Sequence, residues 1–228
     1  MEYQQLHPWN VSQEEAVRIQ RELRDRLVMQ PPAGFHPRLV AGADVSATKY
    51  SPTVYAGFVV IDLESMATVA EATAIVEVTF PYVPGLLSFR EIPALIEAWK
   101  ALAVRPDVLV LDGHGTAHPR GIGIASHAGL VFDLPTIGCA KSILVGHHDP
   151  LGEERGAMVP LVYRHEVIGT VLRTRSGVSP VYVSPGDHID LATAVELILR
   201  LTPHGKYRLP ETTRRAHKLV NDLRIAQQ

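Results

Sequence analysis

The chain has 228 residues, of which 46% are hydrophobic and 20% charged, so it can bury a full core and we expect one domain over residues 1–228. Its single cysteine, Cys139, excludes an intramolecular disulfide and a cysteine-built zinc site. The net charge of −2 is unusual for a nucleic-acid enzyme, but residues 164–228 are basic, with 10 Lys and Arg against 6 Asp and Glu.

No segment has the composition of an export signal or a membrane span. Met1 is followed by Glu2 and Tyr3 instead of a basic region and an apolar core, and no apolar run approaches the roughly 18 residues that a membrane helix needs. A lone cysteine also fits a reducing compartment. We therefore expect a cytoplasmic protein without a membrane partner, and a monomer.

The first half of the chain predicts one helix and then three strands. Apolar residues over 12–29 recur at helical spacing, with Ser12 as the N-cap and Pro31 after the end. Three β-rich runs and two short connections follow: residues 38–47, 53–63 and 68–80, connected by 49–51 and 64–66. Strands joined so closely are expected to pair as an antiparallel meander.

The second half alternates between helices and strands. After PYVP at 81–84, the pattern predicts a helix to about residue 103, strand 108–111, helix 124–132, strand 136–140, strands 159–163, 167–173 and 181–183, and helices 191–201 and 211–224. Pro210 stands where proline suits the first turn of the last helix. An antiparallel meander leading into parallel β-α-β units is the plan of a ribonuclease H-like α/β fold, a mixed sheet with helices on both faces.

Three acidic residues stand where the pattern expects buried apolar ones. Asp44 interrupts the apolar run 39–45, Asp112 follows the apolar strand 108–111, and Glu91 shares the core-facing stripe of its helix. One such acid alone is more often a satisfied hydrogen-bond partner or a strand-end cap. A buried carboxylate is costly unless it is paired or bound to a cation, so the three together indicate a site.

The donor set of this site indicates phosphoryl chemistry with a hard cation. Carboxylate oxygens, with no cysteine ligands and no HExxH motif, suit Mg²⁺, with Mn²⁺ as a substitute, better than zinc. Such ions activate a bound water and stabilise the oxygens of an in-line displacement. His118, Lys141 and His217 are candidates for the proton donor and the cationic group that this reaction also needs.

Five segments resemble the endonuclease V family, and together they run across nearly the whole chain. They are AGADVSA (41–47), PYVPGLLSFRE (81–91), VLVLDGHGTAHPRGIGIASHAG (108–129), GCAKSILVG (138–146) and PETTRRAHKL (210–219). The resemblance implies a DNA repair endonuclease that uses Mg²⁺ or Mn²⁺ to hydrolyse the second phosphodiester bond 3′ to deoxyinosine, or to inosine in RNA. The products would carry 3′-hydroxyl and 5′-phosphate ends.

Carried over position by position, the resemblance implies a role for each matching residue. The metal-binding acids fall on the three acids already selected by burial. Tyr82 would be a wedge that enters the base stack, although a turn aromatic between Pro81 and Pro84 also explains it from the sequence alone. The remaining roles are implied as follows: Gly85, Leu87 and Gly113 line the pocket for the base, His118 and Lys141 contact phosphate or stabilise the charge of the transition state, and His217 binds the metal or its water.

Two other classes of function stay open. His114 and His118 are four residues apart and a second cluster of His and Asp lies at 147–149, so a zinc hydrolase is one alternative. A non-catalytic nucleic-acid-binding protein of the same fold is the other. A dinucleotide site is not expected, because the glycine-rich run 113–129 lacks the third glycine of that motif.

Overall fold

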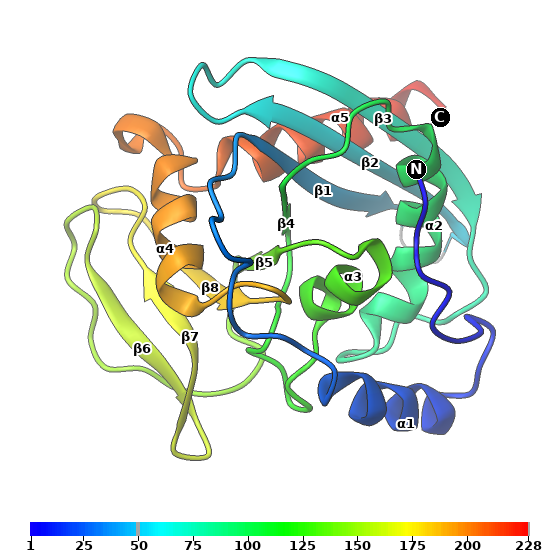
Figure 1. The fold of residues 1–228 in the computed structure, drawn as a ribbon, viewed down its shortest axis with the longest axis horizontal. Helices are drawn as coiled ribbons and strands as arrows, with labels where there is room; N and C mark the ends of the chain where they lie inside the picture. The colour runs from blue at the N-terminus through cyan, green and yellow to red at the C-terminus, as the bar shows by residue number, and fades with distance from the viewer. Residues whose placement is uncertain (49–50, 228) are drawn as a thin grey trace.

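The computed structural model describes residues 1–48 and 51–227, so the predicted connection at 49–51 lies largely outside the described residues. Its helices and strands follow one another in this order (Figure 1): α1 (Gln13–Arg24), β1 (Leu39–Ala47), β2 (Thr53–Asp62), β3 (Thr68–Glu77), α2 (Leu87–Ala101), β4 (Val108–Leu111), α3 (Ile124–Phe132), β5 (Thr136–Ala140), β6 (Met158–Tyr163), β7 (Glu166–Leu172), β8 (Val181–Pro185), α4 (Leu191–Arg200), the 3₁₀ turn η1 (Pro203–Gly205) and α5 (Glu211–Ala226). Each run predicted from the sequence is present, with small differences at its ends.

The strands form one mixed sheet in the order β3-β2-β1-β4-β5-β8-β7-β6. The predicted meander is confirmed, because β1 pairs antiparallel with β2 and β2 with β3. The predicted parallel part is confirmed by β1, β4 and β5. Beyond β5 the sheet returns to antiparallel pairing through β8, β7 and β6, which the sequence left unassigned. A turn as short as that between β6 and β7 permits antiparallel pairing only.

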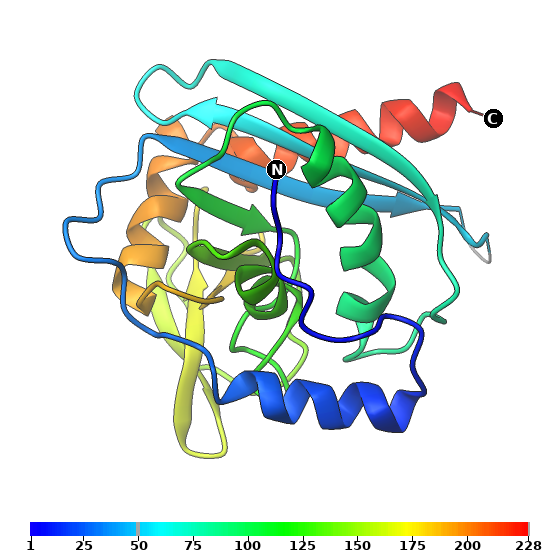
Figure 2. The same cartoon turned by 45° about the vertical axis from the view of Figure 1, so that its right-hand side comes forward.

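Helices cover both faces of the sheet, as the ribonuclease H-like plan predicts (Figures 1 and 2). Alternate residues of β1 divide between two cores: Ala41 and Ala43 join the core that contains Trp99 of α2, whereas Val40 joins the core that contains Ala216 of α5. Helix α3 packs beside α2, and α4 lies on the α5 side. Within the described residues, no helix is both long enough and apolar enough to cross a membrane.

Helix α5 lies directly against the backbone of β1 and β2, and two glycines make this approach possible. A Cβ atom on Gly42 would lie 2.2 Å from the carbonyl carbon of Thr212, the second residue of α5. A Cβ atom on Gly57 would lie 2.8 Å from Cγ1 of Val220. Gly57 is the pairing partner of Asp44. The helix is therefore seated next to the strand position that carries Asp44.

Helix α1 begins as predicted but ends earlier than the apolar spacing suggested. The Ser12 hydroxyl caps its start by accepting a hydrogen bond from the Glu15 amide at 3.1 Å. After Arg24 the chain tightens, because the Leu27 amide bonds to the Arg24 carbonyl, three residues back. The Val28 amide then donates to the Asp187 carboxylate at 2.8 Å. This contact with the turn before α4 draws the chain away from the helix axis.

Candidate active site

Strand register brings the two predicted aspartates together. β1 and β4 are parallel, and Ala43 lies opposite Leu111 in their register. Asp44 and Asp112 are the next residues of the two strands, so they are neighbours on the same face of the sheet. This edge, at the carboxyl ends of parallel strands, is where α/β proteins gather ligands.

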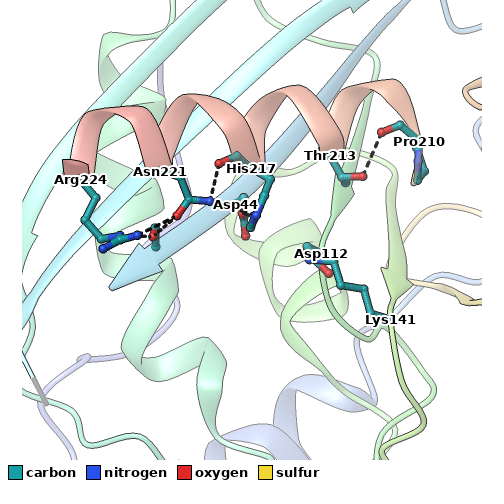
Figure 3. Close-up of polar contacts among 9 residues, drawn as sticks. Asp44, Asp112, Lys141, Pro210, Thr213, His217, Asn221 and Arg224 are labelled. Atoms are coloured by element: carbon teal, nitrogen blue, oxygen red, sulfur yellow. Dashed lines mark hydrogen bonds and ion pairs between the residues drawn. The ribbon is translucent and has the colours of Figure 1, made fainter. Parts of the chain in front are cut away.

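Helix α5 adds a histidine to this pair, as Figure 3 shows. His217 Nδ1 lies 2.8 Å from Asp44 Oδ2. Ligand atoms of Asp44, Asp112 and His217 all lie within 4.8 Å of one another. Among the residues that the structure describes, no other set of His, Cys, Asp and Glu gathers in this way. We refer to these three residues as the acid cluster.

Lys141 supplies a cation beside the acid cluster. It follows β5 directly, as Asp112 follows β4, and its ammonium group forms an ion pair with Asp112 Oδ2 (Figure 3). The Arg208 guanidinium donates to the Lys141 carbonyl at 2.7 Å and so holds the backbone at this position. Two neighbouring strand ends therefore present opposite charges at one point.

Glu91 lies just outside the acid cluster, and the charges of the cluster affect its pKa. It stands in the second turn of α2 and is only partly accessible. Burial raises the pKa of its carboxyl to about 8, and the charges of Asp44 and Asp112 act in the same direction, against a smaller opposing effect of Arg90. A cation bound beside Asp44 and Asp112 would oppose these effects and favour the ionised form of Glu91.

The carboxylates of the acid cluster fit a hard divalent cation. Burial raises the pKa of Asp44, and the neighbouring Asp112 adds to the rise, while the hydrogen bond from His217 opposes it. The Asp44 and Asp112 carboxylates present oxygen donors close together, and a divalent cation bound between them would relieve their repulsion. Mg²⁺ and Mn²⁺ suit such a donor set.

A network of side chains orients His217 (Figure 3). Asn221 Nδ2 donates to His217 Nε2 at 3.0 Å, which leaves the ring proton on Nδ1, facing Asp44. The Asn221 carbonyl oxygen accepts from the Ser46 hydroxyl at 2.8 Å, and Arg224 Nε donates to that hydroxyl at 3.0 Å. The sequence interpretation missed Asn221 and Ser46. The available signal was spacing, since Asn221 is one helical turn after His217 and Ser46 shares the strand face of Asp44.

His118 lies in a different hydrogen-bond network, around the carbonyl of Gly85. That oxygen accepts from His118 Nε2 at 3.0 Å, from Gln20 Nε2 at 3.0 Å and from Arg120 Nη2 at 2.6 Å. His118 Nδ1 accepts from the Arg120 amide, and burial lowers the pKa of this histidine to about 4. Both ring nitrogens are thus engaged within the protein. A direct contact of His118 with phosphate stays a prediction.

The predicted wedge is the most exposed part of this region. Tyr82 is 70% exposed, with exposed prolines at 81 and 84 on either side. Gly85, which ends the loop, has φ +79°, a conformation that suits glycine. The other predicted pocket residues adjoin the site along the chain, because Leu87 begins α2 and Gly113 follows Asp112. Gln20 and Arg120, which hold the loop, were missed from the sequence.

The alternative zinc site built from histidines is not assembled among the described residues. His118 is fully engaged with Gly85 and Arg120, and His114 is not part of the acid cluster. In the segment 147–149, the backbone of His147 pairs with Val162, and no third ligand joins the two histidines. The geometry therefore favours the acids over the histidines as the centre of chemistry.

Comparison with known proteins agrees with this geometry. The family model described as Endonuclease V matches residues 21–218. The chain belongs to the endonuclease V family. It is therefore an endonuclease, an enzyme whose substrate is nucleic acid, and the reading as a non-catalytic binder of the same fold loses its support.

Individual relatives cover nearly the whole chain. Endonuclease V of Myxococcus xanthus is 58% identical over 218 residues, which cover 96% of this chain and 92% of the relative. The structure of endonuclease V from Streptomyces avermitilis matches with a TM-score of 0.89 and 46% identity, covering 96% of each chain. Endonuclease V of Ciona intestinalis, solved in complex with a 24mer DNA containing an inosine followed by a ribo-adenosine, matches with a TM-score of 0.82 and 27% identity, covering 94% of this chain and 98% of the other.

Proposed function

We propose that this chain is a Mg²⁺-dependent endonuclease, with Mn²⁺ as a substitute cation, that cuts the second phosphodiester bond 3′ to deoxyinosine in DNA or inosine in RNA. It acts as a single catalytic domain and leaves 3′-hydroxyl and 5′-phosphate ends. The observation that carries the proposal is the convergence of Asp44, Asp112 and His217 in a member of the endonuclease V family. The inosine-containing DNA bound to the Ciona relative supports the choice of base.

The acid cluster would hold the cation. Asp44 and Asp112 are its first ligands, and Glu91 can join them when it loses its proton. When bound, the cation would activate a water and stabilise charge on the reacting phosphate oxygens. His217 holds a proton at Nδ1 next to this point and can act as a proton donor. Lys141 places its ammonium group where an additional phosphate oxygen would be stabilised.

The loop 81–85 would recognise the base. Reading or cutting at a single base requires that it leave the stack, and this costs least for a weakly paired base such as inosine. Tyr82 is exposed and lies between two prolines. His118 and Arg120 hold the end of the loop by donating to the Gly85 carbonyl, so Tyr82 can act as a rigid wedge. Gly85, Leu87 and Gly113 would then line the pocket for the extruded base.

The direct test offers matched DNA and RNA oligonucleotides that contain inosine, adenosine or guanosine at one position, with Mg²⁺, and maps the cut. We expect cutting of the inosine strands alone, one bond beyond the phosphodiester directly 3′ to inosine. Cutting of the adenosine control at the same site would remove the base assignment, and a cut on the 5′ side would remove the assigned polarity.

A substitution separates chemistry from binding. Asp44→Asn keeps the shape of the side chain and removes its charge, so we expect binding of the inosine strand to be retained and cleavage to fall by at least about a thousandfold. Fluorescence anisotropy and a gel assay measure the two quantities. Unchanged cleavage would exclude Asp44 from the site. Stoichiometric zinc that survives dialysis and is required for activity would favour the histidine-based zinc hydrolase instead.

A further inference from the structure

A groove lies apart from the acid cluster, with none of its three residues in the lining. It is an open groove of about 1070 Å³ whose walls come from the end of α1, the loop after β4, the hairpin between β6 and β7, and the start of α4. Figure 2 shows the tip of this hairpin near the C-terminal end of α1, and residues of both segments line the groove. The volume is slightly above the range of about 300–1,000 Å³ that small-molecule pockets occupy, so the groove can take a larger ligand.

Four arginines line this groove: Arg21, Arg24, Arg120 and Arg164. Within the described part of the chain, Arg21, Arg24 and Arg164 form no ion pair or hydrogen bond through their side chains. Arg18, on the same helix, instead forms ion pairs with Glu15 and Glu22. The charge of Arg21 also lowers the pKa of Arg120, an effect second to that of burial. Neighbouring cations that form no ion pair among the described residues indicate an anionic ligand.

The hairpin tip adds an aromatic surface to these cations. The Arg164 guanidinium lies 5.1 Å from the ring centre of Tyr163, and both residues line the groove. Arg164 and His165 form the two-residue turn with φ of +52° and +67°, a conformation that glycine and asparagine adopt more easily. Strained backbone of this kind tends to occur at functional sites, which agrees with a binding role for the hairpin tip.

Three carboxylates also line the groove and limit its positive charge. The Asp190 carboxylate caps α4 by accepting from the Thr193 amide at 2.9 Å. Asp25 and Glu166 are exposed and offset part of the arginine charge. A groove with a small excess of spaced cations and one aromatic face suits a flexible polyanion with stackable bases better than a compact anion.

The groove is connected to the proposed base-recognition loop. His118 and Arg120 line the groove, and the same two side chains donate to the carbonyl of Gly85 at the end of that loop. The loop and the groove therefore share two side chains and lie next to each other. We propose that this groove binds an unpaired stretch of the nucleic-acid strand flanking the cleavage site, with phosphates at Arg21, Arg24 and Arg164 and a base on Tyr163.

The test compares Arg21→Ser/Arg24→Ser with the matched control Arg18→Ser, which lies on the same helix outside the groove. Binding is measured without divalent cation, at several salt concentrations, for a short single strand centred on inosine and for strands extended by ten nucleotides on the 5′ or the 3′ side. The groove should bind one of the two extensions, and for the strand that carries it we expect the double variant to bind about tenfold more weakly. The slope of log Kd against log salt should fall by roughly 1.4 for this strand, about 0.7 for each lost phosphate contact. The control should match the unchanged protein.

The inference depends on the proposed function only for the position of the lesion, and the experiment separates the two. The same strands with adenosine in place of inosine should show the same loss in the double variant, even if the inosine assignment is wrong. An unchanged salt slope for both extended strands would overturn the groove proposal while leaving inosine-specific cleavage intact.

The aromatic contact has its own test. Tyr163→Phe keeps the ring and should bind the extended strand as the unchanged protein does, whereas Tyr163→Leu should weaken it about tenfold or more because stacking is lost. Equal binding by the two variants would exclude a stacked base on Tyr163.

Discussion

Glu91 has the most perturbed carboxylate chemistry in the site. Its pKa of about 8 means that the side chain is mostly protonated at neutral pH in the absence of a cation. Cation binding must then displace a proton, so cation affinity should increase with pH. The same electrostatics make Glu91 a source of instability in the cation-free protein, because ionising it places three negative charges close together.

This instability predicts a distinct pH dependence for Glu91→Gln. The folded-state pKa lies above the unfolded value of 4.5, so the folded protein holds the extra proton and its unfolding free energy falls as pH rises from about 4.5 through 8. One proton allows a slope of up to roughly 1.4 kcal/mol per pH unit. We expect Glu91→Gln in EDTA to flatten this slope. Urea unfolding at several pH values measures it, and identical slopes would show that Glu91 does not titrate with folding.

Asn221 determines which nitrogen of His217 carries the proton. Replacing it with leucine removes the donor to His217 Nε2 and releases Ser46, so His217 can rotate or change tautomer. Partners that orient a site histidine typically contribute about 10–100-fold in metal affinity or activity. We therefore expect Asn221→Leu to lower cleavage by at least about tenfold and to raise the Mg²⁺ concentration needed for half-maximal rate.

The control for Asn221→Leu is Asp222→Asn on the same helical turn. Asp222 is exposed, and among the described residues its carboxylate pairs with Lys218 alone. Removing its charge should therefore change neither the cleavage rate nor its Mg²⁺ dependence. If both variants behave alike, the hydrogen bond from Asn221 has no specific part in orienting His217.

At the scale of elements, the site depends on how closely α5 approaches β1. Gly42 lies two residues before Asp44 on the same strand face and directly under the first turn of α5. Because side chains alternate along a strand, a Cβ at residue 42 would press on the helix that delivers His217. Close packing at this one position therefore links a small residue in β1 to the geometry of the acid cluster.

Gly42→Ala should push α5 away from the sheet. The added Cβ would meet backbone atoms 2.2 Å away, which cannot rotate aside, so we expect a loss of about 3 kcal/mol in unfolding free energy together with weaker Mg²⁺-dependent cleavage. Gly57→Ala is the comparison variant, because its Cβ would meet a side-chain atom of Val220 at 2.8 Å instead of backbone atoms, so we expect a smaller loss of stability. Denaturant unfolding of both variants tests whether Gly42→Ala lowers the unfolding free energy more than Gly57→Ala does. A Gly42→Ala protein as stable as Gly57→Ala would contradict this account of the packing.

At the scale of the molecule, three side chains from two distant segments hold the recognition loop in place. Gln20 comes from α1, His118 and Arg120 come from the loop after β4, and all three donate to Gly85. A rigid support of this kind is what a wedge needs, since a loose loop would be displaced by the base stack instead of opening it. The support also links the loop to the groove beside α1.

Tyr82→Ala should therefore affect duplex substrates most. In a duplex the wedge must compensate for a few kcal/mol of unstacking and unpairing, whereas a single strand has no pair to open. We expect kcat/KM for inosine in duplex DNA to fall at least about tenfold more than for the same strand alone, and Tyr82→Phe to retain most of the rate. Equal losses on the two substrates would show that Tyr82 does not act as a wedge.

The sequence by itself determined the local elements and the positions of the buried acids. Periodicity and caps depend on residues close in the chain, which is why Ser12 could be identified as a cap, and why Asp44 and Asp112 were recognisable as charges in apolar strands. The β-α-β pattern predicted a parallel pair of strands 108–111 and 136–140, whereas the parallel pairing of β1 with β4 came from the structure. Glu91 was indicated by its place on the core-facing stripe of its helix, and the family resemblance then gave roles to Glu91 and His217.

Only the tertiary structure decided which of these residues meet. His217 and Asp44 are 173 positions apart, and their contact depends on Gly42 admitting α5, which no local pattern reveals. The same applies to the support of Gly85 by Gln20 and Arg120. Such contacts arise from register and close packing between distant segments, so their geometry is set when the elements assemble, and not when each one forms.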